Sequence, residues 1–229
     1  MVMDESTRPA IIKPLAPLCF TLAITAACLF ASAGRLSWSN AWVLLGLSFA
    51  TGLSFIVGRD PELTAERSKI KDGKSWDKVL VGITVLLGPM ATWITAGLDD
   101  RFQWSGVASP AAFAAGIAMA ILGAATIAWA MRSNKFFSSV VRIQKDRGHT
   151  VVANGPYRFI RHPGYAGMFV SILATPLILG SYWALAPAAA TAAVILLRTA
   201  LEDHALHDEL DGYTGYARRV RYRLLPAVW

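Results

Sequence analysis

The run AAFAAGIAMAILGAATIAWAM, residues 111–131, contains no charged side chain. A helix needs about 20 mostly apolar residues to cross a bilayer, because each backbone group must find its hydrogen bond within the segment. The run therefore predicts a membrane-spanning helix. The whole chain of 229 residues agrees, since 55% of it is hydrophobic and only 16% is charged, against about a quarter charged in soluble proteins.

Other apolar runs along the chain extend this prediction. Two short ones are separated by Gly180-Ser181 and predict a tight helical hairpin with a bend at Pro176 or Pro187. We therefore expect an all-α, polytopic transmembrane bundle of about six helices, with a short C-terminal helical hairpin. The further long runs are 15–33, 41–57 and 79–98, and the arms of the hairpin are 165–179 and 182–197.

The distribution of cationic residues predicts the orientation of these helices. Lys and Arg in short loops stay on the cytoplasmic side. If the N-terminus is cytoplasmic, all of the 22 Lys and Arg residues except Arg35 and Arg101 fall on the inner side. We therefore expect cytoplasmic N- and C-termini, and a single membrane domain over residues 1–229, with four helices in 1–131 and a distinct C-terminal region in 132–229.

Charge and cysteine content exclude several classes of function. The net charge of +7 is explained by inner loops that face anionic lipid headgroups, and no basic and aromatic nucleic-acid module is visible. Cys19 and Cys28 lie in one apolar run, too far apart on a helix to form a disulfide. No Cys/His spacing fits a metal site, so we expect no metal. Because the nucleic-acid module is missing, we expect no nucleic-acid partner either. The charged segment 60–77 reads as an exposed helical loop without assignable chemistry.

The polar stretch GHTVVANGPYRFIRHPGYAG, residues 148–167, differs from its apolar surroundings. Its glycines and prolines allow sharp turns and close backbone approach. Arg161 offers a planar fork for a carboxylate or phosphate, and two tyrosines can cover a flat ring or a cation. His149 and His162 can donate or accept hydrogen bonds. The set suits a small amphoteric ligand with an aromatic base, and it equally suits a re-entrant loop anchored at the headgroups.

This stretch resembles a signature of the isoprenylcysteine carboxyl methyltransferase and phospholipid methyltransferase superfamily. That signature has His, two apolar residues, a short gap, Gly-Pro-Tyr and then Arg-His-Pro-x-Tyr-x-Gly. The segment RTALEDHALHDELDGYTGYARRVRYRLLP, residues 198–226, is similar to the second signature, an acidic pair followed by Leu, Gly-x-x-Tyr-x-x-Tyr, Arg-Val and Arg-x-x-Pro. The resemblance covers roughly the last hundred residues. The first four helices match only as membrane spans.

The resemblance implies an integral membrane methyltransferase that uses S-adenosylmethionine, bound by a cytoplasmic loop and tail on either side of the hairpin. Region 132–229 would then be the cofactor-binding region. The family's Glu-Glu pair is Glu202-Asp203 in this chain, and the shorter side chain puts the role of Asp203 in doubt. Residues implied to surround the cofactor are His149, Val151, Val152, Gly155, Tyr157, Arg161, His162, Tyr165, Glu202 and Asp203.

The expected chemistry is methyl transfer by in-line displacement, in which the protein positions and desolvates the reactants. A carboxylate acceptor is already nucleophilic and needs no general base. A guanidinium could hold it through two contacts, with Arg198 as first candidate and Arg161 as second. Arg198 could equally be a snorkelling cap at the inner end of its helix. An amine acceptor would need a base, for which His162 or Glu202 would serve.

Three hypotheses follow. The first is carboxyl O-methylation of an isoprenylcysteine-like or other lipophilic substrate. The second keeps the cofactor but methylates a phospholipid amine or a small thiol. The third is a non-catalytic membrane carrier or assembly factor with the loop as a lipid-binding patch, although the two halves of the chain lack the resemblance expected of a carrier. Membrane lipids are partners in all three, and the oligomeric state is not predicted.

Overall fold

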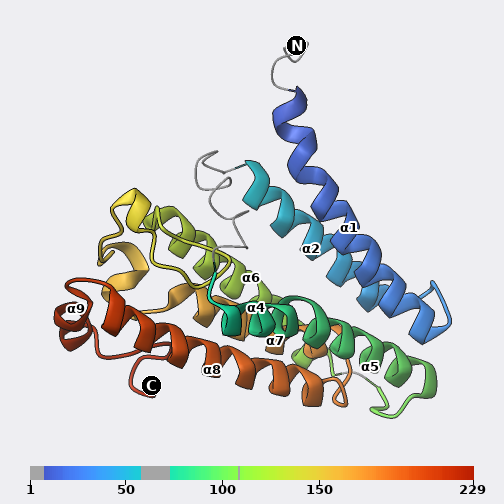
Figure 1. The fold of residues 1–229 in the computed structure, drawn as a ribbon. Helices are drawn as coiled ribbons and strands as arrows, with labels where there is room; N and C mark the ends of the chain where they lie inside the picture. The colour runs from blue at the N-terminus through green and yellow to red at the C-terminus, as the bar shows by residue number, and fades with distance from the viewer. Residues whose placement is uncertain (1–7, 58–72, 108) are drawn as a thin grey trace.

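The computed structural model describes residues 8–57, 73–107 and 109–229 (Figure 1). Within these ranges the regular structure is entirely helical, as the sequence predicts. Short 3-10 turns η3 (Lys145–Arg147) and η4 (Gly155–Arg158) lie in the segment between α6 and α7. The helices are α1 (Arg8–Ala33), α2 (Ser39–Val57), α4 (Ser75–Gly82), the π-helical turn η2 (Ile83–Leu87), α5 (Gly88–Phe102), α6 (Pro110–Ser133), α7 (Pro163–Leu179), α8 (Leu185–Glu209) and α9 (Tyr213–Arg219).

Five helical stretches in the described part of the chain are long and apolar enough to cross a membrane. α4, η2 and α5 follow one another without a break and form a single span, Ser75–Phe102. α7 is apolar but shorter, at 17 residues. Large hydrophobic side chains on these helices, such as Leu122 and Val85, remain exposed, as expected where the solvent is lipid. The chain is therefore an integral membrane protein with a polytopic helical bundle.

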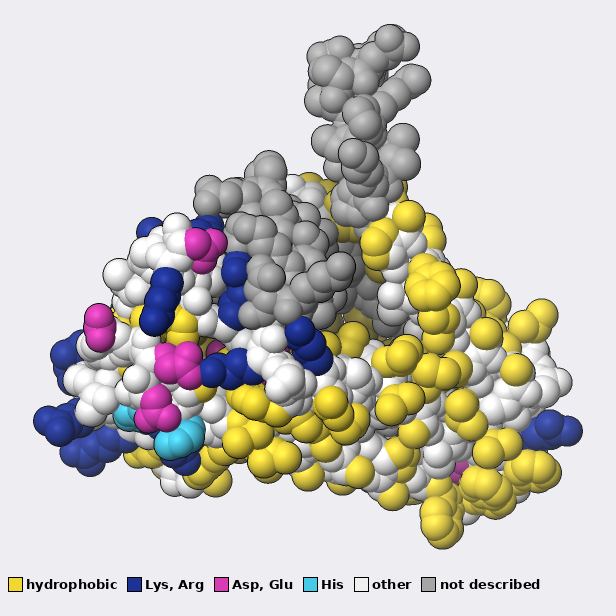
Figure 2. Space-filling view, in the orientation of Figure 1, with side chains coloured by type: hydrophobic (Ala, Val, Ile, Leu, Met, Phe, Trp, Pro, Cys, Tyr) yellow, Lys and Arg dark blue, Asp and Glu magenta, His cyan; other side chains and the backbone are white. Residues whose placement is uncertain are grey.

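The main apolar core lies at one end of the bundle. It joins the C-terminal part of α1 and the start of α2 to α5 and to the turn between α7 and α8, through residues such as Leu29, Leu45, Ala96 and Ile178. In Figure 1, α1 and α2 run side by side and diverge from the helices around α8. Charged side chains gather instead over the end that carries α9 (Figure 2). The polar chemistry of the described chain is thus concentrated away from the apolar core.

α6 and α7 approach each other closely because small residues face each other at their crossing. A Cβ added at Gly167 would lie 2.6 Å from the carbonyl oxygen of Gly123, and one added at Gly123 would lie 2.7 Å from the carbonyl oxygen of Gly167. Membrane helices lack a hydrophobic drive to associate, so they depend on close packing of this kind. The contact fixes α7, whose N-terminal end carries part of the polar stretch.

The predicted hairpin is present, but its second arm differs from the prediction. α7 ends at Gly180, whose φ of 73° is left-handed, and Pro187 lies in the first turn of α8, where a proline costs no helical hydrogen bond. α8 then continues to Glu209 as a full-length span of 25 residues, so the expected end near residue 197 was wrong. The polar last part remains helical because Arg198 and Asp203 are buried and paired with other segments.

The glycine contact gives a stability prediction. Gly167→Ala should lower the free energy of unfolding by about 1–3 kcal/mol, because the new methyl group overlaps the backbone of α6. The matched control is Gly46→Ala in the interior of α2, where an added Cβ meets nothing within 4 Å. Thermal unfolding of both variants in detergent checks this, and equal midpoints for the two would contradict the packing argument.

Candidate functional site

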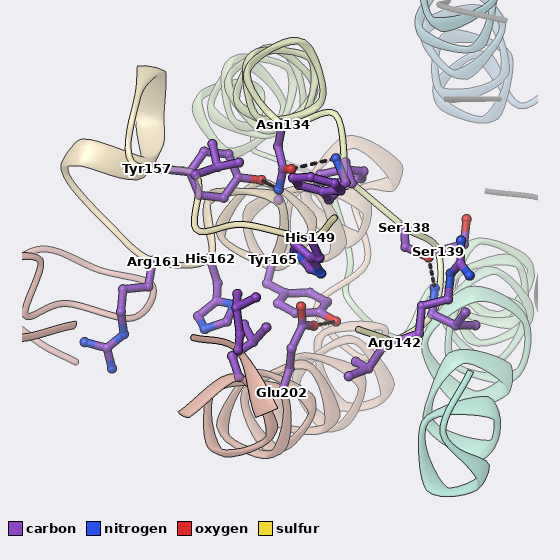
Figure 3. A pocket seen from close by; sticks show the side chains of 18 of the residues that line it. Asn134, Ser138, Ser139, Arg142, His149, Tyr157, Arg161, His162, Tyr165 and Glu202 are labelled. Carbon is purple, nitrogen blue, oxygen red and sulfur yellow. Dashed lines mark hydrogen bonds between the residues drawn. The ribbon is translucent and has the colours of Figure 1, made fainter. Parts of the chain in front are cut away.

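A cavity of about 440 Å³ lies at the polar end of the bundle (Figure 3). Its walls come from the segment between α6 and η3, from residues 149–152, from the start of α7, and from the second half of α8 with α9. Val81 and Val85, on the α4–η2 helix, close one side. The hairpin therefore brings the two polar stretches of the sequence to one cavity, where Arg161 and Glu202 both contribute to the lining.

The loop that forms one wall is held by side-chain hydrogen bonds in place of secondary structure. Gln144 is almost fully buried, and its Nε2 donates to the carbonyl of Phe136 at 2.7 Å. Asn134 accepts from the backbone N–H of Phe136 at 2.8 Å, while its Nδ2 donates to the Tyr157 hydroxyl at 3.2 Å. Each bond ties residues that are near in space but not in a ladder, so the irregular backbone keeps one shape.

His149 enters the cavity wall as a neutral imidazole. Its Nδ1 accepts from the backbone N–H of Gln144 at 3.3 Å, which leaves the hydrogen on Nε2, and its ring lies 4.4 Å from that of Phe136. Burial, with the nearby charges of Arg142 and Arg147, lowers the pKa of His149 to about 4. At neutral pH the residue can therefore donate one hydrogen bond from Nε2 but carries no charge.

Two buried tyrosines support the same wall. The Tyr216 hydroxyl donates to the carbonyl of Tyr157 at 2.6 Å, which joins α9 to the turn η4. Burial raises the pKa of Tyr157, and it raises that of Tyr216 to about 12, so both stay protonated at neutral pH. The phenol rings thus offer flat, uncharged surface around the cavity.

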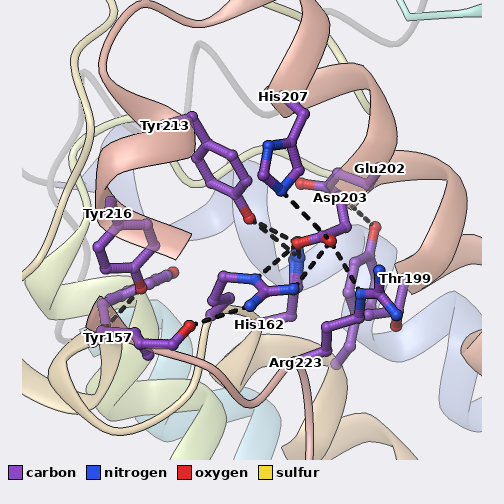
Figure 4. A network of polar contacts seen from close by, with 12 residues as sticks. Tyr157, His162, Thr199, Glu202, Asp203, His207, Tyr213, Tyr216 and Arg223 are labelled. Carbon is purple, nitrogen blue, oxygen red and sulfur yellow. Dashed lines mark hydrogen bonds and ion pairs between the residues drawn. The ribbon is translucent and has the colours of Figure 1, made fainter. Parts of the chain in front are cut away.

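Asp203 is the centre of a buried polar cluster (Figure 4). Arg161 donates to both of its carboxylate oxygens, from Nε at 2.8 Å and from Nη2 at 2.9 Å. Arg223 donates from Nε at 2.8 Å, and the Tyr213 hydroxyl donates at 2.8 Å. Nε2 of His162 lies 3.1 Å from Oδ1. The cluster joins the segment before α7, α8, α9 and the C-terminal segment.

The guanidinium of Arg161 therefore stabilises the fold. Besides its fork on Asp203, its Nη1 donates to the carbonyls of Val220 and Arg221, both at 2.9 Å. The charge of Asp203 raises the pKa of Arg161 against the effect of burial, which lowers it. Arg161 lines the cavity, but its guanidinium is turned to Asp203 and is not displayed to a ligand (Figure 3).

Glu202 has the opposite role from its neighbour Asp203. It lines the cavity, and within the described ranges it accepts one hydrogen bond, from the Tyr165 hydroxyl to Oε2 at 2.5 Å (Figure 3). Among the described residues no cationic group lies within ion-pair distance of it. Of the two carboxylates, Glu202 is therefore the one open to a cationic ligand.

Arg198 is buried, with only 4% of its surface exposed, so the snorkelling interpretation was wrong. Its Nε donates to Oδ1 of Asp77 at 2.6 Å, and its Nη2 donates to Oδ2 of Asp77 at 3.1 Å and to the carbonyl of Ser139 at 2.9 Å. Asp77 also accepts from the backbone N–H of Val141 at 2.7 Å and is fully buried. The expectation that residues 60–77 hold no site chemistry was therefore wrong for Asp77; residues 60–72 lie outside the described part of the chain.

Most residues proposed from the sequence face this cavity, although their ligand roles stay predictions. Gly155 does not line it, because its turn, with φ of 54°, packs against Ser133. Asp203 does not line it either, since it lies behind Arg161 and His162. The lining residues among those proposed are His149, Val151, Val152, Tyr157, Arg161, His162, Tyr165, Arg198 and Glu202.

The sequence analysis missed several parts of the cavity. Asn134 and the following residues up to Arg142 form a wall, but they carry no helical or strand periodicity. Tyr213 and Tyr216 stand three residues apart in the segment that resembles the second family signature, and this spacing could have signalled their role. Asp77 is one of several acidic residues in a charged segment, and only its contact with Arg198 distinguishes it. The described residues contain no cluster of His, Cys, Asp and Glu suited to a metal.

A part of the chain that contributes to this cavity is similar to known proteins. Residues 116–208 match the model of the isoprenylcysteine carboxyl methyltransferase (ICMT) family. Over 52 residues, the chain is 33% identical to the protein-S-isoprenylcysteine O-methyltransferase of Schizosaccharomyces pombe (strain 972 / ATCC 24843). That alignment covers 23% of this chain and 22% of the relative, so the match spans about a fifth of the relative's length.

Fold and site together define a polytopic helical membrane protein with a polar ligand cavity at one end of its bundle. The match over α6, α7 and most of α8 confirms the resemblance seen in the sequence motifs. Residues 116–208 are thus similar to the isoprenylcysteine carboxyl methyltransferase family.

The unequal roles of the two neighbouring carboxylates predict unequal effects on stability. Asp203→Ala should cost about 3–5 kcal/mol in unfolding free energy, because it leaves buried guanidinium groups without a counter-charge. Glu202→Gln should cost less than about 1 kcal/mol, since it keeps an acceptor for Tyr165 and breaks no ion pair. Thermal unfolding in detergent separates the two, and a larger loss for Glu202→Gln would refute this division.

The environment of His149 predicts a pH dependence. Its folded-state pKa of about 4 lies below the 6.5 of an exposed histidine, so the unfolded chain takes up the proton first as the pH falls. Stability contributed by this group is complete above about pH 6.5 and declines towards pH 4. The difference in thermal midpoint between pH 7 and pH 5 should shrink in His149→Gln. It should be unchanged in His204→Gln, because the His204 side chain is 78% exposed.

Proposed function

We propose that the protein is an S-adenosylmethionine-dependent methyltransferase that O-methylates the carboxyl group of a lipophilic, isoprenylcysteine-like acceptor. One observation carries the proposal: Glu202 presents an uncompensated carboxylate inside a cavity that also displays aromatic rings and part of a buried guanidinium. Such a set is complementary to a cationic donor beside an anionic acceptor. The family match supports the reaction class.

The residues of the cavity fit the parts of the donor. Glu202 would bind a cationic group, and Nε2 of His149 would donate a hydrogen bond. Phe136 and Tyr157 would lie against the adenine, since aromatic faces stack on flat rings. A volume of about 440 Å³ is in the range usual for cofactor sites. When bound, S-adenosylmethionine would supply a methyl group activated by a positively charged sulfur.

The chain's own residues would position the acceptor and exclude water. A carboxylate is ionised at neutral pH and needs no residue to remove a proton. Nη1 of Arg198, a cavity residue, has no hydrogen-bond partner among the described residues and is suited to hold an acceptor oxygen. Phe137 and Met168 also line the cavity, so they would help to keep water from the reacting atoms.

The apolar side of the cavity supports a lipophilic acceptor. Val81 and Val85 line the cavity, and Val85 is 61% exposed on the outside of the bundle. An apolar tail leaving the cavity here would meet the lipid-facing surface of the α4–η2 helix. The distribution of Lys and Arg predicts that this end of the bundle is cytoplasmic.

Donor binding gives the first test. Glu202→Gln should weaken the binding of S-adenosylmethionine by at least about tenfold, because the carboxylate is the unpaired anion of the cavity. Asp208→Asn is the matched control, an exposed carboxylate on the same helix that does not line the cavity. Titration calorimetry of the detergent-purified protein measures both. Absence of heat for the wild type up to millimolar donor would favour the non-catalytic carrier.

The methyl acceptor is identified from the methylated product. The wild-type protein should transfer a labelled methyl group to a farnesylcysteine analogue, and the product should be a base-labile methyl ester. Phosphatidylethanolamine and a small thiol, offered in parallel, test the alternative amine and thiol acceptors. Labelling of either one in place of the farnesylcysteine analogue would overturn carboxyl methylation while leaving the methyltransferase proposal intact.

A further inference from the structure

The ion pair between Asp77 and Arg198 fixes the orientation of the Arg198 guanidinium at the cavity. Asp77 accepts hydrogen bonds from Nε and Nη2 of the guanidinium, and the carbonyl of Ser139 accepts a second hydrogen bond from Nη2. Every N–H except the two on Nη1 is thereby used. Because a guanidinium is rigid and planar, fixing one edge also fixes the direction of the other.

Arg198 and Glu202 are one helical turn apart on α8, and both line the cavity. Side chains at this spacing commonly form an ion pair. No such pair is formed here, since the nearest carboxylate of Arg198 is Asp77 and the hydrogen bond of Glu202 comes from Tyr165. Tyr165 contacts both side chains: its hydroxyl donates to Glu202, and its ring centroid is 5.1 Å from Cζ of Arg198.

Keeping these charges apart determines what the cavity can bind. Arg198 is neutralised by Asp77 from outside the cavity, so Glu202 keeps its negative charge for a cationic ligand. If Arg198 turned to Glu202 instead, the cavity would lose both its free carboxylate and its free N–H edge. A buried guanidinium without Asp77 would be driven to this arrangement, because an unpaired buried charge is costly.

We infer that Asp77 is a positioning residue for the methyl-transfer site: it holds Arg198 away from Glu202, so that Glu202 can take the donor's cationic group and Nη1 of Arg198 can take the acceptor's carboxylate. The inference rests on the proposed function. It assigns a role to the N-terminal half of the chain, since Asp77 lies in the first turn of α4, outside the region that matches the family.

The test is a double-mutant cycle on detergent-purified full-length protein. Asp77→Asn should weaken donor binding about tenfold and lower kcat/KM for a farnesylcysteine analogue, because Arg198 would then pair with Glu202. Arg198→Met should spare donor binding while reducing turnover. The double variant should recover the donor affinity but not the turnover, since no guanidinium remains to occupy Glu202 or to hold the acceptor.

The matched control is Asp99→Asn. Asp99 is a similarly buried carboxylate on the same span, but its partners are Ser105 and Ser181, and it does not line the cavity. Thermal midpoints measured for every variant separate loss of folding from loss of binding. The number of donor molecules bound per protein then shows what fraction of each variant is folded, so that each affinity is that of the folded protein.

Two results would overturn the inference while wild-type turnover stands. One is donor affinity and kcat/KM in Asp77→Asn within about twofold of the wild type. The other is a loss of donor affinity in Asp77→Asn that persists unchanged in the double variant, because Asp77 would then act by another route. Absence of wild-type turnover, by contrast, would count against the proposed function itself.

Discussion

The cavity depends on the buried carboxylate of Asp203. Two guanidinium groups, a histidine and a tyrosine converge on it, and they come from four segments of the chain. A buried anion is costly unless it is fully hydrogen-bonded, and here the cost is met by partners that must fold together to supply it. Assembly of the loop before α7, the end of α8, α9 and the C-terminal segment is therefore linked at this one group.

A second buried ion pair likewise joins separate segments of the chain, at the opposite wall of the cavity. Asp77 and Arg198 connect the α4 end of a membrane span to α8, and the N–H of Val141 adds the loop after α6. Both pairs are outside the main apolar core, which lies at the far end of the bundle. At the apolar end, close packing acts together with the hydrogen bonds of Asp99 to Ser105 and Ser181, while charge-assisted hydrogen bonds between ionised groups hold the end that carries the cavity. Directional bonds suit a binding site because they fix side-chain orientation as well as distance.

The different roles of Glu202 and Asp203 illustrate how helix geometry divides neighbouring residues. Adjacent positions on a helix point about 100° apart, so one carboxylate can face the cavity while the other faces the loop behind it. The sequence analysis singled out the shorter carboxylate as the doubtful ligand, and in the structure Asp203 is indeed taken up by the fold. Arg161 was expected to serve a ligand, yet its donors are directed to Asp203 and to backbone carbonyls. Nothing in the order of residues indicates which cations a buried anion will capture.

The sequence by itself determined the membrane class, the helical spans, the hairpin and the resemblance to a family, because long apolar runs and ordered motifs are local properties of the chain. It also marked most of the residues that face the cavity. Only the tertiary structure decided that α8 continues through Glu209, that Asp77 is buried against Arg198, and which carboxylate stays open. These features depend on pairings between residues up to 121 positions apart, as for Asp77 and Arg198. The free energy of a buried charge is set by its neighbours in space and not by its neighbours in sequence.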